Sequence, residues 1–433
     1  MIVPSIDIQQ GRAVQLRGGK FETLDLGDPM ALAERYSRVG EIAIVDLDAA
    51  RGIGDNSAMV MELARRWPCR VGGGIRTRET ALRYLDAGAR ALMIGTKDSP
   101  DFLSEFPRER LIAALDIRGE EIFDEGWKHG TGQKLGPRMA ELADHVGGFL
   151  VTFIENEGNL RGLDLRAAEA ILAKAKGVRV TFAGGAAEPS EIAALDRIGA
   201  DVQAGTAIAL GKLDLGAAFA APLITDREDG FWPTIVADEG GETLGLVWSD
   251  LESLSLAVKT GKGVYRSRKR GIWIKGEESG ASQELVRIET DCDRDALRFI
   301  VRQSGTGFCH TGSWSCFGER RGLGMLERTI AERKMTAPEG SYTRRLFDSP
   351  TMLASKLREE AAELANTIKK ADAISEAADV FYFTLVKLAA EGATVADVEA
   401  ELDRRSRKIT RRGGNVKPAY AKDSREDTWA GLH

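Results

Sequence analysis

Three of the four cysteines of this chain fall within one short segment, and three aspartates surround the first of them. Cysteine thiolates bind zinc, whereas carboxylates prefer a hard ion such as magnesium. Three thiolates fill three of the four tetrahedral positions around zinc, and the fourth can hold a water whose pKa falls to about 7. The segment therefore predicts a hydrolytic site with zinc and magnesium. The expected zinc ligands are Cys292, Cys309 and Cys316, and the expected magnesium ligands are Asp291, Asp293 and Asp295.

Two other interpretations of this segment are open. The cysteines could be small buried side chains and the aspartates a solvated turn, although the combination of ligand types disfavours this. The cysteines could also hold a structural zinc ion in a module that binds protein or nucleic acid. Such a module would need a fourth thiolate or histidine and basic surroundings, and the flanking aspartates disfavour it.

Two acidic helices are predicted closer to the C-terminal end. In the helix expected at 356–368, carboxylates four residues apart share one face, and the helix expected at 376–392 begins with two carboxylates one turn apart. Two such faces opposed in a bundle form an all-oxygen cage for Mg²⁺, while a solvated acidic surface is the alternative. The expected ligands are Glu359, Glu360, Glu363, Glu376 and Asp379.

The elements of the first 220 residues alternate short apolar runs with amphipathic stretches. Eight strand–helix units predict a (βα)8 TIM barrel, whose chemistry lies at the carboxyl ends of its strands. The expected strands are 2–6, 42–47, 69–73, 91–95, 111–116, 149–154, 178–183 and 201–205.

Glycine-rich strand ends recur in two neighbouring pairs within this barrel. Glycine lets backbone N–H groups approach an anion, so the two pairs predict a substrate with a phosphate at each end. The glycines could instead only make tight turns. The expected phosphate contacts are Gly73, Gly74, Gly95, Thr96, Gly184, Gly185, Gly205 and Thr206.

The whole chain is expected to be multidomain, because 433 residues exceed one compact core. The predicted parts are the N-terminal TIM barrel at 1–222, a central α+β metal-binding domain at 232–319, a C-terminal all-α domain at 322–415 and a tail at 416–433. A net charge of −6 disfavours nucleic acid as a partner, and no apolar run is long enough to span a membrane. The clustered cysteines leave no disulfide framework, so a reducing, cytoplasmic location is expected.

The cysteine segment resembles the phosphoribosyl-AMP cyclohydrolases through D-C-D-x-D, C-H-T-G and S-C-F, and the resemblance continues upstream through 245–283. In that family the cysteines hold zinc, the aspartates hold magnesium, and zinc-bound hydroxide opens the adenine ring. The resemblance implies that His310 assists as an acid or base. It makes Arg268, Lys275 and Ser279 candidate contacts to substrate or phosphate.

The barrel is similar to the ProFAR isomerases of histidine biosynthesis through PSID (4–7), VGGGIR (71–76) and ALDIRG (114–119). That family performs an Amadori rearrangement without a metal, which would make Asp7 the general base and Asp116 the general acid, with Thr152 assisting. Three positions depart from the family pattern, namely Gln15, Phe153 and Glu157. The alternative is therefore a degenerate barrel that serves folding or dimerisation. The fungal multifunctional histidine proteins, which the second half also resembles, carry such a domain.

The C-terminal part resembles the phosphoribosyl-ATP pyrophosphatases through PEGSYTRRLF (338–347), KxxEEAAE (356–363) and EAAD (376–379). The resemblance implies that the carboxylates bind magnesium and that Lys356 contacts phosphate. The three resemblances name consecutive steps, from phosphoribosyl-ATP to phosphoribosyl-AMP, to ProFAR and then to PRFAR. Relatives of the last two domains are dimers with sites across the interface, so a homodimer that binds phosphoribosyl nucleotides is expected.

Overall fold

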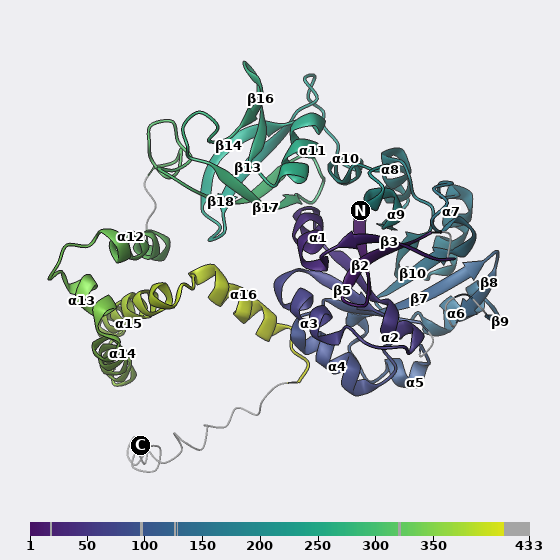
Figure 1. Cartoon of the computed structure of the whole chain (residues 1–433), viewed down its shortest axis with the longest axis horizontal. Helices are drawn as coiled ribbons and strands as arrows, with labels where there is room; N and C mark the ends of the chain where they lie inside the picture. Colours follow the sequence, from purple (N-terminus) through teal and green to yellow (C-terminus); the bar gives the residue numbers. More distant parts are fainter. Residues whose placement is uncertain (18–19, 96–97, 125–126, 128, 319–321, 411–433) are drawn as a thin grey trace, which may run out of the picture.

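The computed structural model describes residues 1–17, 20–95, 98–124, 127, 129–318 and 322–410. A barrel, a central sheet domain and a group of helices follow one another along the chain (Figure 1).

The N-terminal part is a closed barrel of eight parallel strands, as predicted. Each strand pairs with its neighbour in the order β1, β4, β5, β6, β7, β10, β11 and β12, and β12 pairs with β1 to close the ring. The strands are β1 (Ile2–Gln9), β4 (Ile42–Asp46), β5 (Cys69–Gly72), β6 (Ala91–Ile94), β7 (Leu111–Arg118), β10 (Gly148–Phe153), β11 (Arg179–Ala183) and β12 (Ala200–Ala204).

Helices cover the outside of this barrel, and their ends follow local chemistry. The Thr77 hydroxyl accepts the N–H of Thr80 to start α4, and Gly88 ends it at a φ of 129°. The helices and 3₁₀ turns are α1 (Pro29–Tyr36), η1 (Ser37–Val39), α2 (Leu47–Arg51), α3 (Ser57–Arg66), α4 (Arg78–Ala87), α5 (Pro100–Leu103), η2 (Arg108–Arg110), α6 (Leu135–Leu142), η3 (Ile154–Asn156), α7 (Leu165–Lys174), α8 (Pro189–Arg197), α9 (Thr206–Ala209) and α10 (Leu215–Ala220).

Two antiparallel hairpins extend barrel strands beyond the predicted set. β2 (Arg12–Arg17) and β3 (Lys20–Gly27) continue from β1, and β8 (Glu121–Asp124) and β9 (His129–Lys134) continue from β7. Every residue of β9 is exposed, so this strand carries no alternation of apolar and polar residues that could have predicted it.

The inside of the barrel is filled by small and aliphatic side chains and is closed at its N-terminal end by a buried arginine. Arg70 donates to the Thr181 hydroxyl at 3.0 Å and to the Glu41 carboxylate. The aliphatic layer consists of Val3, Ala43, Ala91, Met93, Ile112, Leu150 and Ala183. The opposite end, where the strands finish, is therefore the end that can hold a site.

The central domain is a six-stranded sheet in the order β16, β15, β14, β13, β18, β17, with one helix, α11 (Leu251–Thr260). Its strands are β13 (Trp232–Asp238), β14 (Thr243–Ser249), β15 (Val264–Ser267), β16 (Gly271–Ile274), β17 (Gln283–Thr290) and β18 (Leu297–Gln303). Helix α11 packs closely on α10 of the barrel, because a Cβ at Gly216 would lie 2.5 Å from the Cα of Ser255. The buried apolar residues of the barrel and of the sheet domain accordingly form one continuous core.

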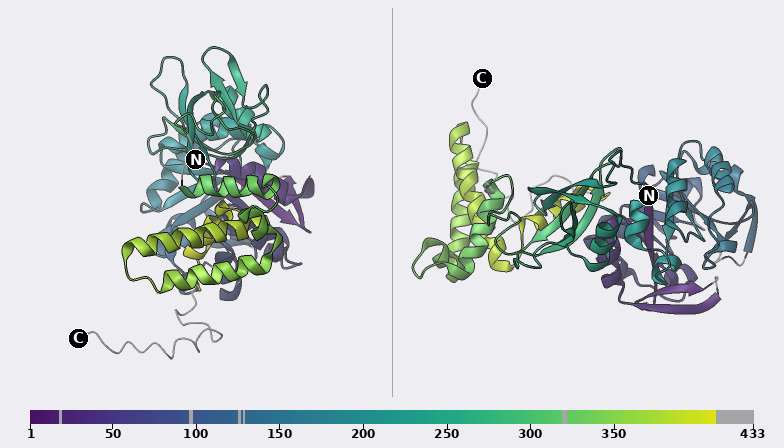
Figure 2. Two further views of the ribbon diagram at one scale, coloured as in Figure 1. Left: turned by 90° about the vertical axis from the view of Figure 1, so that its left-hand side faces the viewer. Right: turned by 90° about the horizontal axis from the view of Figure 1, so that it is seen from above.

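The C-terminal part is all helical, as predicted, and has its own apolar core around Leu346, Leu353 and Phe383. Helices α14 and α15 lie side by side (Figure 2), whereas α16 reaches back to the barrel. The helices are α12 (Gly322–Thr336), α13 (Tyr342–Asp348), α14 (Pro350–Ala365), α15 (Lys370–Glu391) and α16 (Val395–Ser406). No described helix has the length and apolar composition needed to cross a membrane.

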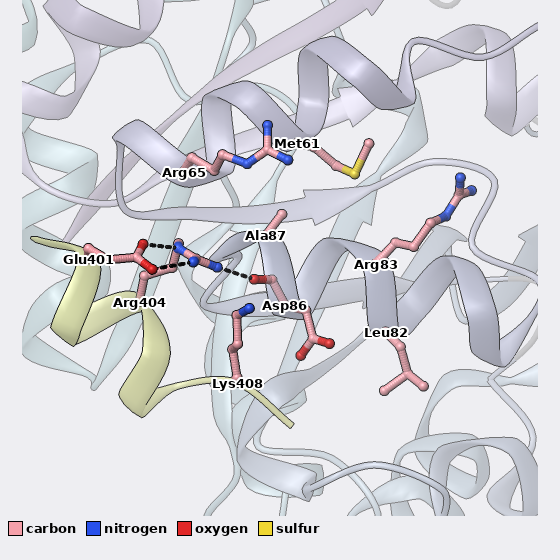
Figure 3. Close-up of a pocket in the computed structure, with 9 residues that line it drawn as sticks. All are labelled: Met61, Arg65, Leu82, Arg83, Asp86, Ala87, Glu401, Arg404 and Lys408. Carbon is pink, nitrogen blue, oxygen red and sulfur yellow. Dashed lines mark hydrogen bonds and ion pairs between the residues drawn. The ribbon is translucent and has the colours of Figure 1, made fainter. Parts of the chain in front are cut away.

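The seam between α16 and the barrel contains a cavity of about 560 Å³ (Figure 3). Arg404 donates to the carbonyl of Asp86 at 3.0 Å, and the carboxylate of Asp86 accepts the N–H of Ile409 at 3.1 Å. Arg110 donates to the carbonyl of Arg407 at 2.8 Å. Helix α4 ends, and strand β7 begins, on the N-terminal rim of the barrel, so this seam lies on that rim.

Candidate active sites

The barrel places Asp7 and Asp116 on opposite sides of its mouth. Asp7 lies on β1 and Asp116 on β7, and three strands separate β1 from β7 in either direction around the ring. Both residues occupy inward positions, in phase with Val3 and Ile112 of the inner layer. The two carboxylates that the sequence singled out therefore face one interior space.

Burial gives Asp7 the proton affinity that acid–base chemistry needs near neutral pH. It raises the pKa of Asp7 from 3.8 to about 7, with the positive charge of Arg51 acting in the opposite direction. A carboxyl group with this pKa exists in both protonation states near pH 7, which suits it to take up and return a proton.

Asp116 is held by two hydrogen-bond donors. The indole Nε1 of Trp127 donates to its carboxylate at 2.9 Å, and the Thr152 hydroxyl donates from the paired position of β10. Burial raises the pKa of Asp116, and these two donors oppose the shift. The role of Trp127 was not predicted, because it depends on a loop in which this residue adopts a φ of 71°.

Glu157, one of the three departures from the family pattern, is a third carboxyl group in the same mouth. Burial raises its pKa to about 7, and the charges of Asp7 and Asp116 add to the shift. Because like charges at close range cannot all ionise, the three groups share fewer than three negative charges near neutral pH.

The other two departures from the family pattern, Phe153 and Gln15, lie in different surroundings. The ring of Phe153 stacks on Phe182 with centroids 5.9 Å apart, at a position of β10 that alternates with the inward-facing Thr152. Gln15 is buried, and its side-chain oxygen would lie 2.8 Å from a Cβ placed on Gly205. Gln15 therefore contacts a predicted phosphate loop, whereas Phe153 packs in the layer between strand and helix.

The predicted phosphate loops have the same construction on both halves of the barrel. Gly73 and Gly74 have φ values of 95° and 67°, and Gly184 and Gly185 have 86° and 113°. A Cβ on Gly73 would lie 2.2 Å from the carbonyl oxygen of Asp46, and one on Gly184 would lie 2.5 Å from that of Phe153. Only glycine fits either place.

The start of α9, directly after the last barrel strand, adds a polar atom that fits a bound anion. In the described part of the chain, the Thr206 hydroxyl is buried without a hydrogen-bond partner. A buried hydroxyl in this state is stabilised when a ligand oxygen accepts from it. A Cβ placed on Gly95 would make an ordinary contact with the carbonyl oxygen of Ala114 at 3.7 Å, so glycine is not required there by space, and Thr96 lies outside the described residues.

Two of the three predicted zinc ligands meet in the central domain. The thiols of Cys309 and Cys316 contact each other, and the Thr311 hydroxyl donates to the Cys309 sulfur at 3.1 Å. This donation lowers the pKa of Cys309 to about 6, whereas burial raises that of Cys316. A thiolate is the form that binds zinc, so the pair fits that metal.

Cys292 is placed apart from this pair. Within the described ranges, none of the groups of three or more ligand atoms that lie within 4.8 Å of one another contains a cysteine. The Cys292 sulfur is exposed and lies 3.9 Å from a carboxylate oxygen of Asp293. One chain thus brings two of the three predicted thiols into contact, and Cys292 does not complete a close group of three with them.

The remaining predicted residues of the central domain differ in exposure. His310 is exposed, with its Nδ1 3.8 Å from the Cys309 sulfur. Arg268 is exposed above the ring of Trp248, and the exposed Ser279 accepts the N–H of Ala281. Lys275 is only 7% exposed and donates to the carbonyl of Ala281 at 3.0 Å, close to both paired thiols. The ammonium group of Lys275 therefore interacts with the backbone and with the paired thiols in this structure.

Asp291, Asp293 and Asp295 form an exposed cluster, which we call the aspartate loop. Their ligand atoms lie within 4.8 Å of one another. One oxygen of Asp291 accepts the backbone N–H groups of Asp295 and Ala296 at 3.1 and 3.2 Å, and the charge of Asp293 raises the pKa of Asp295. A hard cation relieves this repulsion, so the donor set fits Mg²⁺.

The helical domain gathers three of its five predicted magnesium ligands, Glu360, Glu363 and Glu376. Glu359 pairs instead with Lys356 at 2.7 Å, and Lys356 also reaches Glu360 at 2.9 Å. Asp379 lies nearby, but burial and then Glu363 are the main causes of the raised pKa of Glu376.

A cavity of about 460 Å³ adjoins these carboxylates at the turn between α14 and α15. It brings a lysine and an amide beside the acidic cluster, which suits a phosphate-bearing ligand held through a metal ion. Lys369, which lines it, was not singled out from the sequence because no periodicity marks a turn residue. The lining residues are Glu363, Asn366, Thr367, Ile368, Lys369, Asp372 and Glu376.

Three family models match consecutive parts of the chain. The histidine biosynthesis protein model matches 1–214, the phosphoribosyl-AMP cyclohydrolase model matches 245–318, and the phosphoribosyl-ATP pyrophosphohydrolase model matches 323–406. The predicted resemblances of all three parts are confirmed by these matches.

Curated relatives carry related names. The histidine biosynthesis bifunctional protein HisIE of Pyrococcus furiosus is 39% identical over 196 residues, which are 42% of this chain and 93% of the relative. The histidine biosynthesis trifunctional protein of Neurospora crassa is 39% identical over 328 residues, covering 72% of this chain and 37% of the relative. The bifunctional protein his7 of Schizosaccharomyces pombe is 48% identical over 209 residues, covering 48% and 50%. The chain thus spans half or less of the length of these two fungal relatives.

Proposed function

We propose that this chain, which belongs to the family of histidine biosynthesis proteins with phosphoribosyl-AMP cyclohydrolase and phosphoribosyl-ATP pyrophosphohydrolase domains, catalyses consecutive steps of that pathway. The observation that carries the proposal is that each matched segment contains its own cluster of ligand or acid–base groups. The expected sequence runs from phosphoribosyl-ATP to phosphoribosyl-AMP, then to ProFAR, and in the barrel to PRFAR.

The helical domain would release pyrophosphate. Glu360, Glu363 and Glu376 would hold Mg²⁺, which supplies charge neutralisation and an activated water when bound. Lys369 and Asn366 line the adjoining cavity and would orient the phosphates. Lys356, paired with two glutamates, would position Glu360 instead of contacting phosphate directly.

The central domain would open the adenine ring. Cys309 and Cys316 would hold zinc, which supplies hydroxide when bound, and the aspartate loop would hold Mg²⁺. His310, beside Cys309 and open to solvent, would move the proton. Because Cys292 is exposed and lies apart from the thiol pair, the third zinc ligand would come from Cys292 of a second copy, which implies a homodimer.

The barrel would isomerise ProFAR with its own side chains. Asp7 would remove the carbon-bound proton, and Asp116, held by Trp127 and Thr152, would protonate the ring oxygen. The glycine loops at 73–74 and 184–185 would receive the two phosphates. This step needs no metal.

A barrel that serves only as a platform is the second candidate. Two observations favour it: Glu157 adds a third carboxyl group to the mouth, and Gln15 contacts the loop at Gly205. Both change the electrostatics that a doubly phosphorylated substrate would meet.

One incubation separates the candidates. The purified chain is given phosphoribosyl-ATP, Mg²⁺ and Zn²⁺, and the products are separated by chromatography against standards before mass detection, because ProFAR and PRFAR are isomers. We expect PRFAR from the wild type, ProFAR from Asp7→Asn, phosphoribosyl-AMP from Cys309→Ser, and unchanged substrate from Glu360→Gln. A wild type that stops at ProFAR would make the barrel a platform, and one that leaves phosphoribosyl-ATP intact would refute the proposal.

A further inference from the structure

Arg294, the residue between Asp293 and Asp295, ties the aspartate loop to the barrel. Its guanidinium forms an ion pair with Asp196 near the end of α8. Its carbonyl accepts the N–H of Ile224, in the segment that connects barrel and sheet domain, at 3.0 Å. Side chain and main chain of one residue are therefore both fixed by elements outside the loop.

The backbone of Arg294 adopts a conformation that arginine rarely takes. Its φ is 65°, in the left-handed region that favours glycine or asparagine. A long side chain stays in this region when surrounding contacts over-determine it. Because the neighbouring residues on either side are the two exposed aspartates, this backbone conformation sets the directions in which their carboxylates leave the chain.

The carboxylate that receives Arg294 is itself held by the barrel. Asp196 is largely buried and also accepts from the amino group of Met1 at 3.1 Å. The same amino group contacts Asp201 at 2.9 Å, and Asp201 is fixed by Arg179. The position of Asp196, near the end of α8, is therefore fixed by Met1, the residue before β1, and through Met1 by Asp201 of β12.

We propose that the pair Asp196–Arg294 is a positioning device through which the barrel sets the metal-binding geometry of the aspartate loop. This inference rests on the proposed metal site of the central domain and deepens it. Neither residue touches reacting atoms. The barrel would thus contribute to the cyclohydrolase step whether or not it isomerises anything.

The direction in which metal affinity changes when Arg294 is removed distinguishes a positioning role from simple electrostatic repulsion. A guanidinium between two metal-binding carboxylates repels a cation, so its removal alone would tighten metal binding. If Arg294 instead holds the carboxylates in place, its removal loosens binding despite the lost repulsion. The two explanations thus predict opposite changes for the same variant.

The test uses Mn²⁺ as the probe, followed by electron paramagnetic resonance, on the full-length zinc-loaded chain with Glu360→Gln to silence the helical-domain site. We expect Arg294→Gln and Asp196→Asn each to weaken Mn²⁺ binding by roughly five- to tenfold, the size of a partly buried ion pair. The double variant should be no weaker than either single variant, because both remove one interaction. Arg294→Lys should stay close to the parent, and kcat of the cyclohydrolase step should recover in these variants at saturating metal.

A matched control separates the pair from general effects. Arg298→Gln removes an exposed arginine that pairs with Glu289 and has no part in holding Arg294 or Asp196. This variant should bind Mn²⁺ like the parent. Unchanged or tighter binding in Arg294→Gln would overturn the inference while the metal site stands. Binding that persists unchanged in Asp293→Asn would instead remove the proposed metal site and the inference with it.

Discussion

The raised pKa of Asp7 predicts that Asp7→Asn stabilises the barrel while it abolishes isomerisation. The folded protein holds this carboxyl group with a pKa of about 7, against 3.8 for an exposed aspartate. A group whose pKa is raised by folding contributes its full stability below the unfolded pKa, and this stability is lost as the pH rises through the folded pKa. Asparagine does not ionise, so it avoids the loss.

The size of the effect follows from the same two pKa values. Ionisation of Asp7 lowers the free energy of unfolding by about 2 kcal/mol at pH 5 and by about 4 kcal/mol at pH 8, taking 1.36 kcal/mol for each pH unit between the two pKa values. The advantage of the asparagine variant should therefore grow between pH 5 and pH 8 and level off above pH 8.

The assay must isolate the barrel, because a chain of several domains does not unfold in one step. Urea titrations at pH 5 and pH 8, with hydrogen exchange of peptides from β1 and β7 as the readout, report the barrel transition alone. Asp201→Asn is the matched control of opposite sign. Burial would raise the pKa of Asp201, but Arg179 and the amino group of Met1 lower it, so its stabilisation is present at neutral pH and lost as the pH falls.

One result would refute the reasoning about Asp7. If Asp7→Asn is no more stable than the wild type at pH 8, burial does not hold this carboxyl group protonated. The raised pKa could then no longer explain how Asp7 acts as a base near neutral pH.

Further predictions concern the other contacts. Trp127→Phe should slow isomerisation about tenfold, because Asp116 loses a donor, while pyrophosphate release stays unchanged; separate assays of the two steps check this. Asp86→Ala should speed hydrogen exchange of α16 about tenfold or more, because the carboxylate that holds the segment after this helix is lost; unchanged exchange would contradict the docking role. Glu360→Gln should reduce pyrophosphate release at least about a hundredfold, whereas Glu359→Gln, whose carboxylate pairs with lysine outside the cluster, should keep most of it; equal losses would refute this assignment of ligands.

The barrel could be predicted from the sequence because its eight strands are apolar runs that end at glycines and aspartates. Asp7 and Asp116 could be located by the same argument, since each follows such a run. The hairpin strand β9, with the sequence HGTGQK, could not, because all its residues are exposed and the pairing with β8 comes from the backbone. An alternation of apolar and polar residues indicates a strand with one buried face, and β9 has no buried residue.

The position of each site could be predicted better than the full set of side chains that form it. The donation from Trp127 to Asp116 depends on a left-handed backbone in a loop, and the approach of Glu157 to both aspartates depends on the turn after β10. Spacing along the chain also grouped Cys292 with Cys309, whereas in the described part of one chain no group of three ligand atoms within 4.8 Å contains a cysteine. The sequence of a short segment shows which types of ligand it can offer. The distances between those ligands depend on the conformation of loops and on the other elements that pack against them.

Several polar contacts that join the domains meet the barrel on one rim, in addition to the packing of α11 on α10. Arg38 in η1 donates to the carbonyl of Val258 in α11 at 3.0 Å. Asp86 at the end of α4, Arg38 and Asp196 near the end of α8 all lie where helices finish and strands begin. The carboxylates of the mouth lie at the other end of the same strands. These polar contacts on the N-terminal rim involve none of the carboxylates of the mouth, so Asp7, Asp116 and Glu157 take no direct part in them. The same separation means that Asp196 can position the aspartate loop whether the barrel is an isomerase or a platform.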